Sequence, residues 1–477
     1  MSRERIAWMV SIILLAVLAM NLPGSLAERD DDFAWVRTLV EVHRQVLNNY
    51  VEPVNDSELR EKAIDGMLSD LDPFTDYIPP DLQEKFDQLL DGTFKGVGIT
   101  LDAEDGKMTV VTPIEGSPAD LAGIEAGDVI TKVNGESITG LTIDQVVKKV
   151  TGPVHTPVTL TILRDGKSLD FTMMRKQLVV STVKGYSRNR DDSWNYFVSQ
   201  HPKIGYVRIT QFDTNDSTNT YDELKEALIT GKPATANQPA TKGLIDQGMQ
   251  GLILDLRFNP GGRLEQAVKV VNMFIKEGKI VTTRGRNRPE QIERATGDGT
   301  LLNFPLIVLI NDKSASAAEI VSGSLKDNGR ALIVGTRSYG KGSVQELMPL
   351  DDNGGELKLT VAYYYLPSGR LVHRRKNATD WGVEPQIIVP MDDDTSELLR
   401  IEMEDRDIIR RNAATLAAAT RPTTHPSTHP TTMPTDTQLD TAIDTMSSAI
   451  DHHDGKLPID AAATQPSTMA SATRAAG

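Results

Sequence analysis

Two short apolar runs each lead through a turn into a helical pattern, and this arrangement constrains the fold more than any other feature of the chain. Leu252–Leu256 precedes a helix expected over Gly261–Lys276. Leu306–Ile310 precedes a second helix, expected over Ser316–Asp327. Short apolar runs that alternate with helices are typical of buried strands in an α/β unit. The sequence therefore predicts an α/β core that begins near Ile204.

Further elements of this core follow from the same reasoning. The sequence predicts a helix over Tyr221–Leu228 and strands over Ile204–Ile209, Ala331–Val334, Leu357–Tyr364 and Ile387–Val389. We place this core at residues 177–392 and a C-terminal helix at 393–410.

The 86 residues before this core read as a compact module rich in strands. Strands separated by Gly and Asp turns are expected over Gly98–Leu101, Met108–Val111, Val129–Val133, Val158–Leu163 and Leu169–Met173. A short helix is expected over Pro118–Ala122, and a longer one over Thr142–Val150. We give this module the boundaries 91–176.

The region 31–90 has helical periodicity. Trp35, Leu39, Val42 and Val46 recur at spacings of three and four, as one face of a helix requires. A second helix is expected over Ser57–Leu71, capped by Asp56 or Ser57. We interpret this segment as a helical arm.

The two ends of the chain differ from the rest. Residues 1–27 combine early arginines, an uncharged apolar run and small residues at its end, which predicts an export signal or, if it is not cleaved, a membrane anchor. Residues 411–477 are rich in Thr, Pro, Ser and Ala, and we expect a disordered tail there.

Composition excludes several functions. The net charge of −15 and the lack of a basic stretch argue against a nucleic-acid-binding protein. The chain has no cysteine, so disulfides, thiolate nucleophiles and zinc–cysteine sites are excluded.

A serine and a lysine form the main candidate pair for catalysis. Ser316 begins a helix, where free N–H groups and the helix dipole favour a developing anion. Lys341 lies between two glycines, and its apolar flanks suggest a buried strand hairpin. A lysine acts as a base when burial or positive neighbours lower its pKa. The alternatives are a serine, Ser314 or Ser316, that only caps the helix, and a lysine in an ordinary loop.

A third motif lies between the first apolar run and its helix. Asp255-Leu-Arg-Phe-Asn-Pro-Gly-Gly262 ends in paired glycines, whose N–H groups can form an anion-binding turn. The alternative is a plain tight connection.

Together these motifs resemble those of the carboxyl-terminal processing proteases, the tail-specific peptidase family. The resemblance rests on the turn at 255–262, Ser314-Ala-Ser-Ala-Ala-Glu319 and Gly340-Lys-Gly-Ser-Val-Gln345, and extends over roughly residues 36–392. It implies that Ser316 is the nucleophile, Lys341 the general base and Gln345 the residue that orients the lysine. The implied oxyanion donors are the N–H of Ala317 and that of Gly261 or Gly262.

The module at 91–176 resembles the PDZ domain that this family carries. The resemblance implies a carboxylate-binding loop, a strand to which a peptide adds, and a helix that faces its last side chain. The residues involved would be Phe94, Gly96, Val97, Gly98, Ile99, Val146 and Val150. Arg164 is either a regulatory link to the core or a solvated hairpin charge.

The expected protein is thus a multidomain α+β chain, with a PDZ-type β-rich module between a helical arm and a crotonase-like ββα serine protease core. It would be an exported serine endopeptidase of the bacterial periplasm or the outer face of the cytoplasmic membrane. Its partners would be proteins or peptides with exposed C-termini, and it would need no metal or cofactor. An adaptor and a homo-oligomer are left open. The alternative functions are a silent or partner-gated peptide-binding scaffold, a hydratase-like enzyme on a related core and a histidine-dependent hydrolase.

Overall fold

The computed structural model describes residues 34–83, 86, 93–104, 107–189, 193–213, 219–232, 240–351, 354–408, 435–452 and 457. The segment predicted as an export signal, 1–27, lies outside these ranges. No helix within them is both long enough and apolar enough to cross a membrane. The chain divides into two units, Met1–Asp81 with Leu347–Leu359, and Leu82–Glu346 with Thr360–Gly477.

The first unit contains the two helices expected in the arm. They are α2 (Ala34–Asn49) and α3 (Asp56–Leu68), followed by strand β1 (Asp76–Ile78), which pairs antiparallel with the start of β21 (Glu356–Tyr365). The cap of α3 differs from our expectation: Asn55 precedes the helix, and its side chain accepts a hydrogen bond from the Ser57 N–H at 3.0 Å. No residue of α2 is buried.

The strand-rich module has the strands and helices that the sequence predicts. Its elements are β2 (Thr93–Gly96), β3 (Ile99–Glu104), β4 (Lys107–Pro113), α5 (Pro118–Ala122), β5 (Val129–Val133), β6 (Glu136–Ser137), α6 (Ile143–Val150), β7 (Pro157–Arg164), β8 (Lys167–Met174) and β9 (Lys176–Val179). The main sheet has the order β3-β4-β5-β7-β8 and is antiparallel, so β3 lies at its edge. β2 pairs separately with β9.

The α/β core is built on a mostly parallel sheet. Its elements are β10 (Val183–Lys184), β11 (Ser187–Arg188), β12 (Trp194–Asn195), β13 (Phe197–Val198), β14 (His201–Ile209), α7 (Thr220–Lys225), the π-helix η1 (Glu226–Thr230), β15 (Gly251–Asp255), α8 (Leu264–Asn272), β16 (Lys279–Gly285), β17 (Arg288–Arg294), β18 (Leu306–Ile310), α9 (Ala317–Asp327), β19 (Leu332–Gly335), β20 (Ser343–Pro349), β21, β22 (Ile387–Ile388), α10 (Asp393–Asp407) and α12 (Thr437–His452). The sheet order is β10-β14-β15-β18-β19-β22, and its strands are parallel from β14 to β22.

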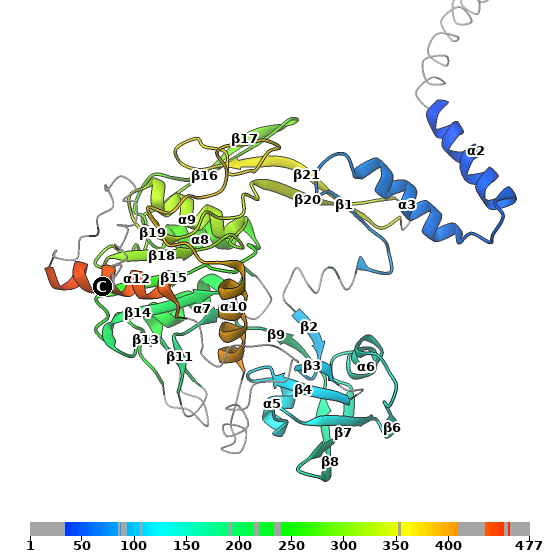
Figure 1. The fold of residues 1–477 in the computed structure, drawn as a ribbon, viewed down its shortest axis with the longest axis horizontal. Helices are drawn as coiled ribbons and strands as arrows, with labels where there is room; N and C mark the ends of the chain where they lie inside the picture. Colours follow the sequence, from blue (N-terminus) through cyan, green and yellow to red (C-terminus); the bar gives the residue numbers. More distant parts are fainter. Residues whose placement is uncertain are drawn as a thin grey trace, which may run out of the picture. The chain divides into compact units, whose positions relative to one another are not determined.

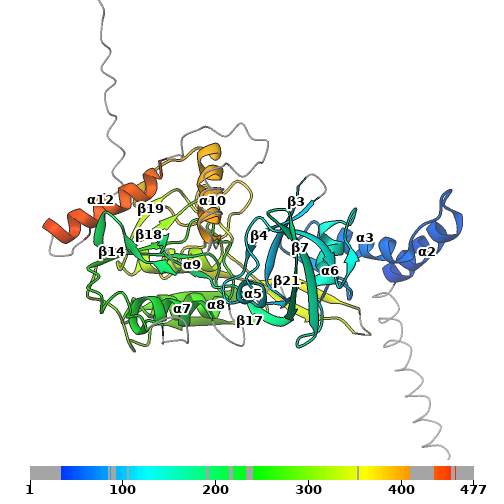
Figure 2. The ribbon, with the colours of Figure 1, turned by 90° about the horizontal axis from the view of Figure 1, so that it is seen from below.

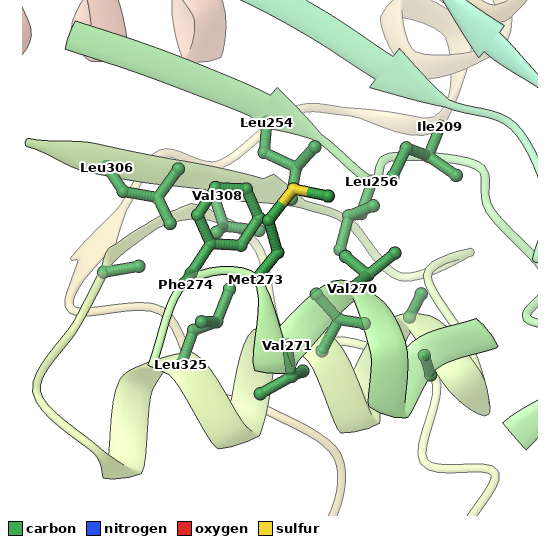
Figure 3. Packing of buried hydrophobic residues seen from close by; sticks show 14 of the residues in the cluster. Ile209, Leu254, Leu256, Val270, Val271, Met273, Phe274, Leu306, Val308 and Leu325 are labelled. Atoms are coloured by element: carbon green, nitrogen blue, oxygen red, sulfur yellow. The ribbon is translucent and has the colours of Figure 1, made fainter. Parts of the chain in front are cut away.

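Both faces of this sheet are buried, which explains why its strands are continuous apolar runs rather than alternating ones. On one face, Leu254 and Val308 pack against α8 residues and against Leu325 of α9 (Figure 3). On the other face, Ile253 and Ile307 pack against α12. Figure 1 shows the strands β14, β15, β18 and β19 side by side, and Figure 2 shows α12 and the pair α8–α9 on opposite sides of this sheet.

Two expectations are corrected here. The disordered tail predicted at 411–477 contains an ordered helix, because Leu439, Ala442, Ile443 and Met446 of α12 bury an apolar stripe against the sheet. The hairpin expected around Lys341 does not form, because the strands before and after it join different sheets. β19 pairs with β18 and β22, whereas β20 pairs with β21.

The helix expected over Gly261–Lys276 is also shorter. It begins at Leu264, because Gly261 and Gly262 have φ values of 105° and 134°, outside the helical region. With these corrections, the chain is a multidomain α+β protein whose β-rich module precedes a ββα core.

Candidate active site

Ser316 lies in the turn between β18 and α9, in an unusual backbone conformation. Its φ is 55° and its ψ is −116°, and a residue with a Cβ adopts such values only where the surrounding structure holds it there. The residue is 9% exposed. Its Oγ lies 2.8 Å from the Oη of Tyr364 on β21. A serine hydroxyl at a strained strand-to-helix turn is suited to nucleophilic attack.

Ser314, the other serine of this turn, has a structural role. Its hydroxyl donates to the carbonyl of Leu256 at 2.7 Å and accepts the N–H of Asn311 at 2.9 Å. These bonds join the ends of β18 and β15, so Ser314 does not cap α9 with its side chain.

The turn after β15 lies against the turn that carries Ser316. The carbonyl of Asn259 accepts the N–H of Ala315 at 2.9 Å, and its side chain donates to the carbonyl of Ile209 at 2.8 Å. A Cβ added to Gly261 would lie 2.5 Å from the Cβ of Ser316 and 3.0 Å from the amide nitrogen of Ala317. Only glycine allows this approach.

The backbone N–H groups that could bind an oxyanion are those that have no acceptor in these two turns. The N–H of Gly261 donates to Asn259 Oδ1 at 2.8 Å, so it is engaged within its own turn. In the described part of the chain the N–H of Gly262 has no hydrogen-bond partner. Ala317 is the first residue of α9, where an N–H has no acceptor within the helix. Gly262 and Ala317 are therefore the donors that remain.

Glu319 connects the serine turn to the loop that carries Lys341. Its carboxylate accepts the N–H of Ser316 at 2.8 Å, that of Gly340 at 2.7 Å and that of Lys341 at 2.8 Å. It also accepts the hydroxyl of Ser338 at 2.5 Å. Burial raises the pKa of Glu319 to about 7, although these four hydrogen bonds lower it.

Lys341 is half-buried, and its glycine neighbours allow the loop to pack closely. A Cβ added to Gly342 would lie 2.4 Å from the amide nitrogen of His373. The carbonyl of Gly342 accepts the N–H of Tyr364 at 2.9 Å. The Nε2 of Gln345 donates to the hydroxyls of Ser343 and Thr360 at 2.8 and 3.1 Å. The loop that carries Lys341 thus packs against His373 and the strand of Tyr364.

The candidate peptide groove of the module is partly as expected. Ile99 begins the edge strand β3, and Gly98 has a φ of 80° with its carbonyl bonded to the Ile114 N–H. A cavity is lined here by residues of the loop and of α6: Gly96, Val97, Gly98, Ile99, Val147 and Val150. Val146, which we expected in this set, is wholly buried in the core of the module instead. Phe94 lies in β2, and its side chain is outside the described part.

Arg164 makes its described contacts within the module. Its guanidinium donates two bonds of 2.7 Å to Asp128, one of 3.1 Å to Glu125 and one of 2.8 Å to the carbonyl of Gly123. Asp128 is buried. Arg164 is therefore an internal anchor of the turn at 123–128 and not a solvated hairpin charge.

Comparisons with known proteins identify the family of the chain. Family models match in three places: Peptidase family S41 over residues 203–389, PDZ domain over 109–164 and Activating protease CtpB N-terminal domain over 22–81. A carboxy-terminal-processing protease of Bartonella bacilliformis is 39% identical over 352 residues, which cover 73% of this chain and 74% of that protein. The chain belongs to the carboxy-terminal-processing proteases of peptidase family S41.

Two further matches are similar in extent. The carboxy-terminal processing protease CtpA of Bacillus subtilis is 33% identical over 358 residues, which cover 74% of this chain and 69% of that one. The solved structure of a photosystem II D1 C-terminal processing protease has 27% identity and a TM-score of 0.41, and covers 79% of this chain and 97% of its own. The family models and the two bacterial relatives show that this carboxy-terminal-processing protease is a serine-type peptidase with a PDZ domain.

The sequence motifs assign no role to two residues at the site of this S41 protease. Glu319 was part of a recognised motif, but no role was assigned to it. The available signal was a single carboxylate in the otherwise uncharged run from Ser314 to Leu325. Tyr364 carried no signal beyond a strand position, because only the fold brings it to Ser316.

Proposed function

We propose that this S41 protease is an exported endopeptidase that cleaves peptide bonds with Ser316 as nucleophile and Lys341 as general base. One observation carries the proposal. The strained turn of Ser316 and the loop of Lys341 are bound to the same carboxylate oxygen, Glu319 Oε2. The backbone of both residues is therefore held at one point of the site.

In this mechanism the amine of Lys341 is neutral and takes the proton of the Ser316 hydroxyl. The Oγ attacks a peptide carbonyl, and a tetrahedral intermediate forms. Its collapse releases the amine product, to which Lys341 returns a proton, and leaves an ester on Ser316. Water then attacks this ester with Lys341 again as base, and the free serine is restored.

The negative oxygen of the intermediate needs donors that are already in place. The N–H groups of Ala317 and Gly262 support this role, since neither has an acceptor in its own turn or helix. Gly261 supports it indirectly, because its lack of a side chain lets the two turns approach.

For Gln345 we propose a role in orienting the Lys341 side chain. Its amide is fixed by Ser343 and Thr360, at the start of β20 and on the adjacent β21. Substitution by alanine should therefore lower kcat more than it changes KM.

The PDZ domain suits the capture of a peptide carboxyl terminus. Among the described residues, its edge strand β3 pairs on one side only, with β4. The glycines at 96 and 98 allow backbone N–H groups to face a carboxylate. We propose that exposed, apolar C-terminal tails bind there. Export, by a signal at residues 1–27, would bring the enzyme to envelope substrates.

The test uses protein from residue Glu28 onward with an unfolded substrate that ends in apolar residues. Cleavage by the wild type should be lost in Ser316→Ala and in Lys341→Ala, while their circular dichroism and melting temperature stay unchanged. Lys62→Ala, which removes an exposed lysine of α3, should cleave normally. Activity that survives in Ser316→Ala would overturn the site assignment.

A wild-type protein that cleaves nothing would point to the scaffold or partner-gated alternative. The presence of both Ser316 and Lys341 argues against a silent scaffold. Reaction of the wild type, but not of Ser316→Ala, with a fluorophosphonate would separate a gated enzyme from an inert one.

A further inference from the structure

Tyr364 contacts the proposed nucleophile and the loop that carries the proposed base. Its phenol oxygen lies 2.8 Å from Ser316 Oγ. Its backbone N–H donates to the carbonyl of Gly342, the residue that follows Lys341, at 2.9 Å. One residue of β21 thus contacts the nucleophile with its side chain and the loop of the base with its main chain.

The side chain of Tyr364 is buried. The residue is 4% exposed and packs in the main hydrophobic cluster of the core. Burial and the nearby carboxylate of Glu319 raise its pKa, while the bond to Ser316 opposes this. Tyr364 therefore keeps its proton at neutral pH.

The direction of the bond to Ser316 follows from the chemistry. The resting hydroxyls can each donate or accept. Once Ser316 has transferred its proton, its oxygen can only accept, so the phenol must be the donor. A donor held by a buried side chain stabilises a developing negative oxygen strongly.

We propose that Tyr364 is a catalytic residue whose phenol O–H donates to Ser316 Oγ whenever that oxygen carries negative charge. This inference rests on the proposed role of Ser316. During acylation the Ser316 O–H bond breaks and its proton goes to the lone pair of Lys341 Nζ. The Oγ bonds to the peptide carbon, and the π electron pair moves to the carbonyl oxygen. Tyr364 keeps its own proton throughout.

The same contact acts in the second half of the reaction. During deacylation Ser316 Oγ is the leaving group, and the electron pair of the breaking ester bond returns to it. The phenol donates to this oxygen until Ser316 regains a proton from Lys341. Both steps should therefore slow if the donor is lost.

The alternative is that Tyr364 is a structural core residue whose buried hydroxyl forms a hydrogen bond without a role in catalysis. A neighbouring tyrosine on β21 provides a matched control. Tyr363 and Tyr365 are half-buried, and Tyr365 packs under the guanidinium of Arg284 at 4.7 Å. Tyr365→Phe removes a hydroxyl from the same strand without touching Ser316.

The experiment compares the wild type, Tyr364→Phe, Tyr365→Phe and Ser316→Ala, each from Glu28 onward. The readouts are kcat and KM on the unfolded substrate, the rate of inactivation by a fluorophosphonate and the melting temperature. For Tyr364→Phe we expect kcat and the inactivation rate to fall about 10- to 100-fold, as for a lost bond to a charged group. KM should change less than about twofold, because the phenol donates to a charge that develops only in the transition state. Tyr365→Phe should match the wild type.

The experiment distinguishes a failure of the role of Tyr364 from a failure of the proposed function. Wild-type rates in Tyr364→Phe, or an equal loss in Tyr365→Phe, would overturn the role of Tyr364 while Ser316→Ala stays inactive. Activity in Ser316→Ala would instead overturn the proposed function. If Tyr364→Phe does not fold, 3,5-difluorotyrosine at position 364 retains the shape and the donor but ionises at lower pH. The kcat of this variant should fall at alkaline pH, where the kcat of the wild type does not. If kcat did not fall in this way, the result would contradict the proposal.

Discussion

Ser316 and Lys341 donate their backbone N–H groups to the same oxygen of Glu319, each at 2.8 Å. The two residues belong to separate turns, one before α9 and one before β20. The shared oxygen explains how the fold holds the turns of the proposed nucleophile and the proposed base together without a direct chain connection. It also makes the ionisation of Glu319 a property that can be tested.

The first prediction concerns the pH dependence of stability. The pKa of Glu319 is raised from 4.5 to about 7 by burial. The folded protein therefore holds this proton more tightly than the unfolded chain. The resulting stabilisation is fully present below pH 4.5 and is lost as the pH rises to about 7. The change amounts to at most about 3 kcal/mol.

Urea unfolding of the wild type and of Glu319→Gln between pH 4 and pH 8 measures this contribution. The free energy of unfolding of the wild type should fall relative to that of the variant as the pH rises. All other ionisable groups are common to both proteins. A constant difference between the two curves would show that Glu319 does not titrate in this range.

The second prediction concerns the close approach of Gly261 to Ser316. Gly261→Ala would place a Cβ 2.5 Å from the Cβ of Ser316, and the φ of 105° adds strain. The turns must then separate, and kcat/KM should fall by about 100-fold. Gly116→Ala is the matched control, because its φ is 71° but no atom lies within 4 Å of the added Cβ. Equal kinetics in the two variants would contradict the argument.

Much of the fold follows from local patterns in the sequence. β18 has the bounds that its apolar run predicts, and α5 and β5 also match in full. The serine and lysine loops were likewise recognisable from their motifs. These features depend on residues that are adjacent in the chain, which is where periodicity and turn chemistry carry information.

The errors arise where distant segments meet. The apolar stripe of α12 was hidden by flanks rich in Thr and Pro, and only the buried face of the sheet explains why it folds. The hairpin expected at Lys341 failed because pairing partners are set by topology. The contact of Tyr364 with Ser316 was out of reach for the same reason. Contacts between side chains that are distant in the chain produce no local sequence pattern from which they could be predicted.

A third prediction concerns Arg164. Its bonds to Asp128 and Glu125 lie within the PDZ domain, with 22% of its side chain exposed. Arg164→Ala leaves the buried carboxylate of Asp128 without its charged partner, with the N–H of Glu125 at 2.9 Å still bonded to it. The domain should therefore lose about 1–3 kcal/mol of stability. Hydrogen exchange on the whole protein should show faster exchange at 123–128. Cleavage of tailed substrates should fall, while fluorophosphonate reactivity stays normal.

Lys167→Ala, at an exposed position of the same hairpin, is the control for Arg164. It should change neither exchange nor cleavage. If Arg164→Ala instead lowers fluorophosphonate reactivity while hydrogen exchange in the PDZ domain stays unchanged, Arg164 has the regulatory role that the family resemblance suggested.

The last prediction concerns the ion pair between Arg257, in the turn after β15, and Asp436, just before α12. Arg257 is 1% exposed and makes bonds to Asp255, and its guanidinium also donates to both oxygens of Asp436 at 2.7 and 2.9 Å. Asp436→Ala leaves part of a buried positive charge unpaired, so the free energy of unfolding should fall by about 3 kcal/mol. Asp440→Ala removes a carboxylate in the first turn of α12, whose pKa is raised by burial and by Asp436 and Asp444. It should therefore be neutral or slightly stabilising. Urea unfolding of both variants at pH 7 decides this, and equal stabilities would mean that the Arg257–Asp436 pair contributes nothing to the docking of α12.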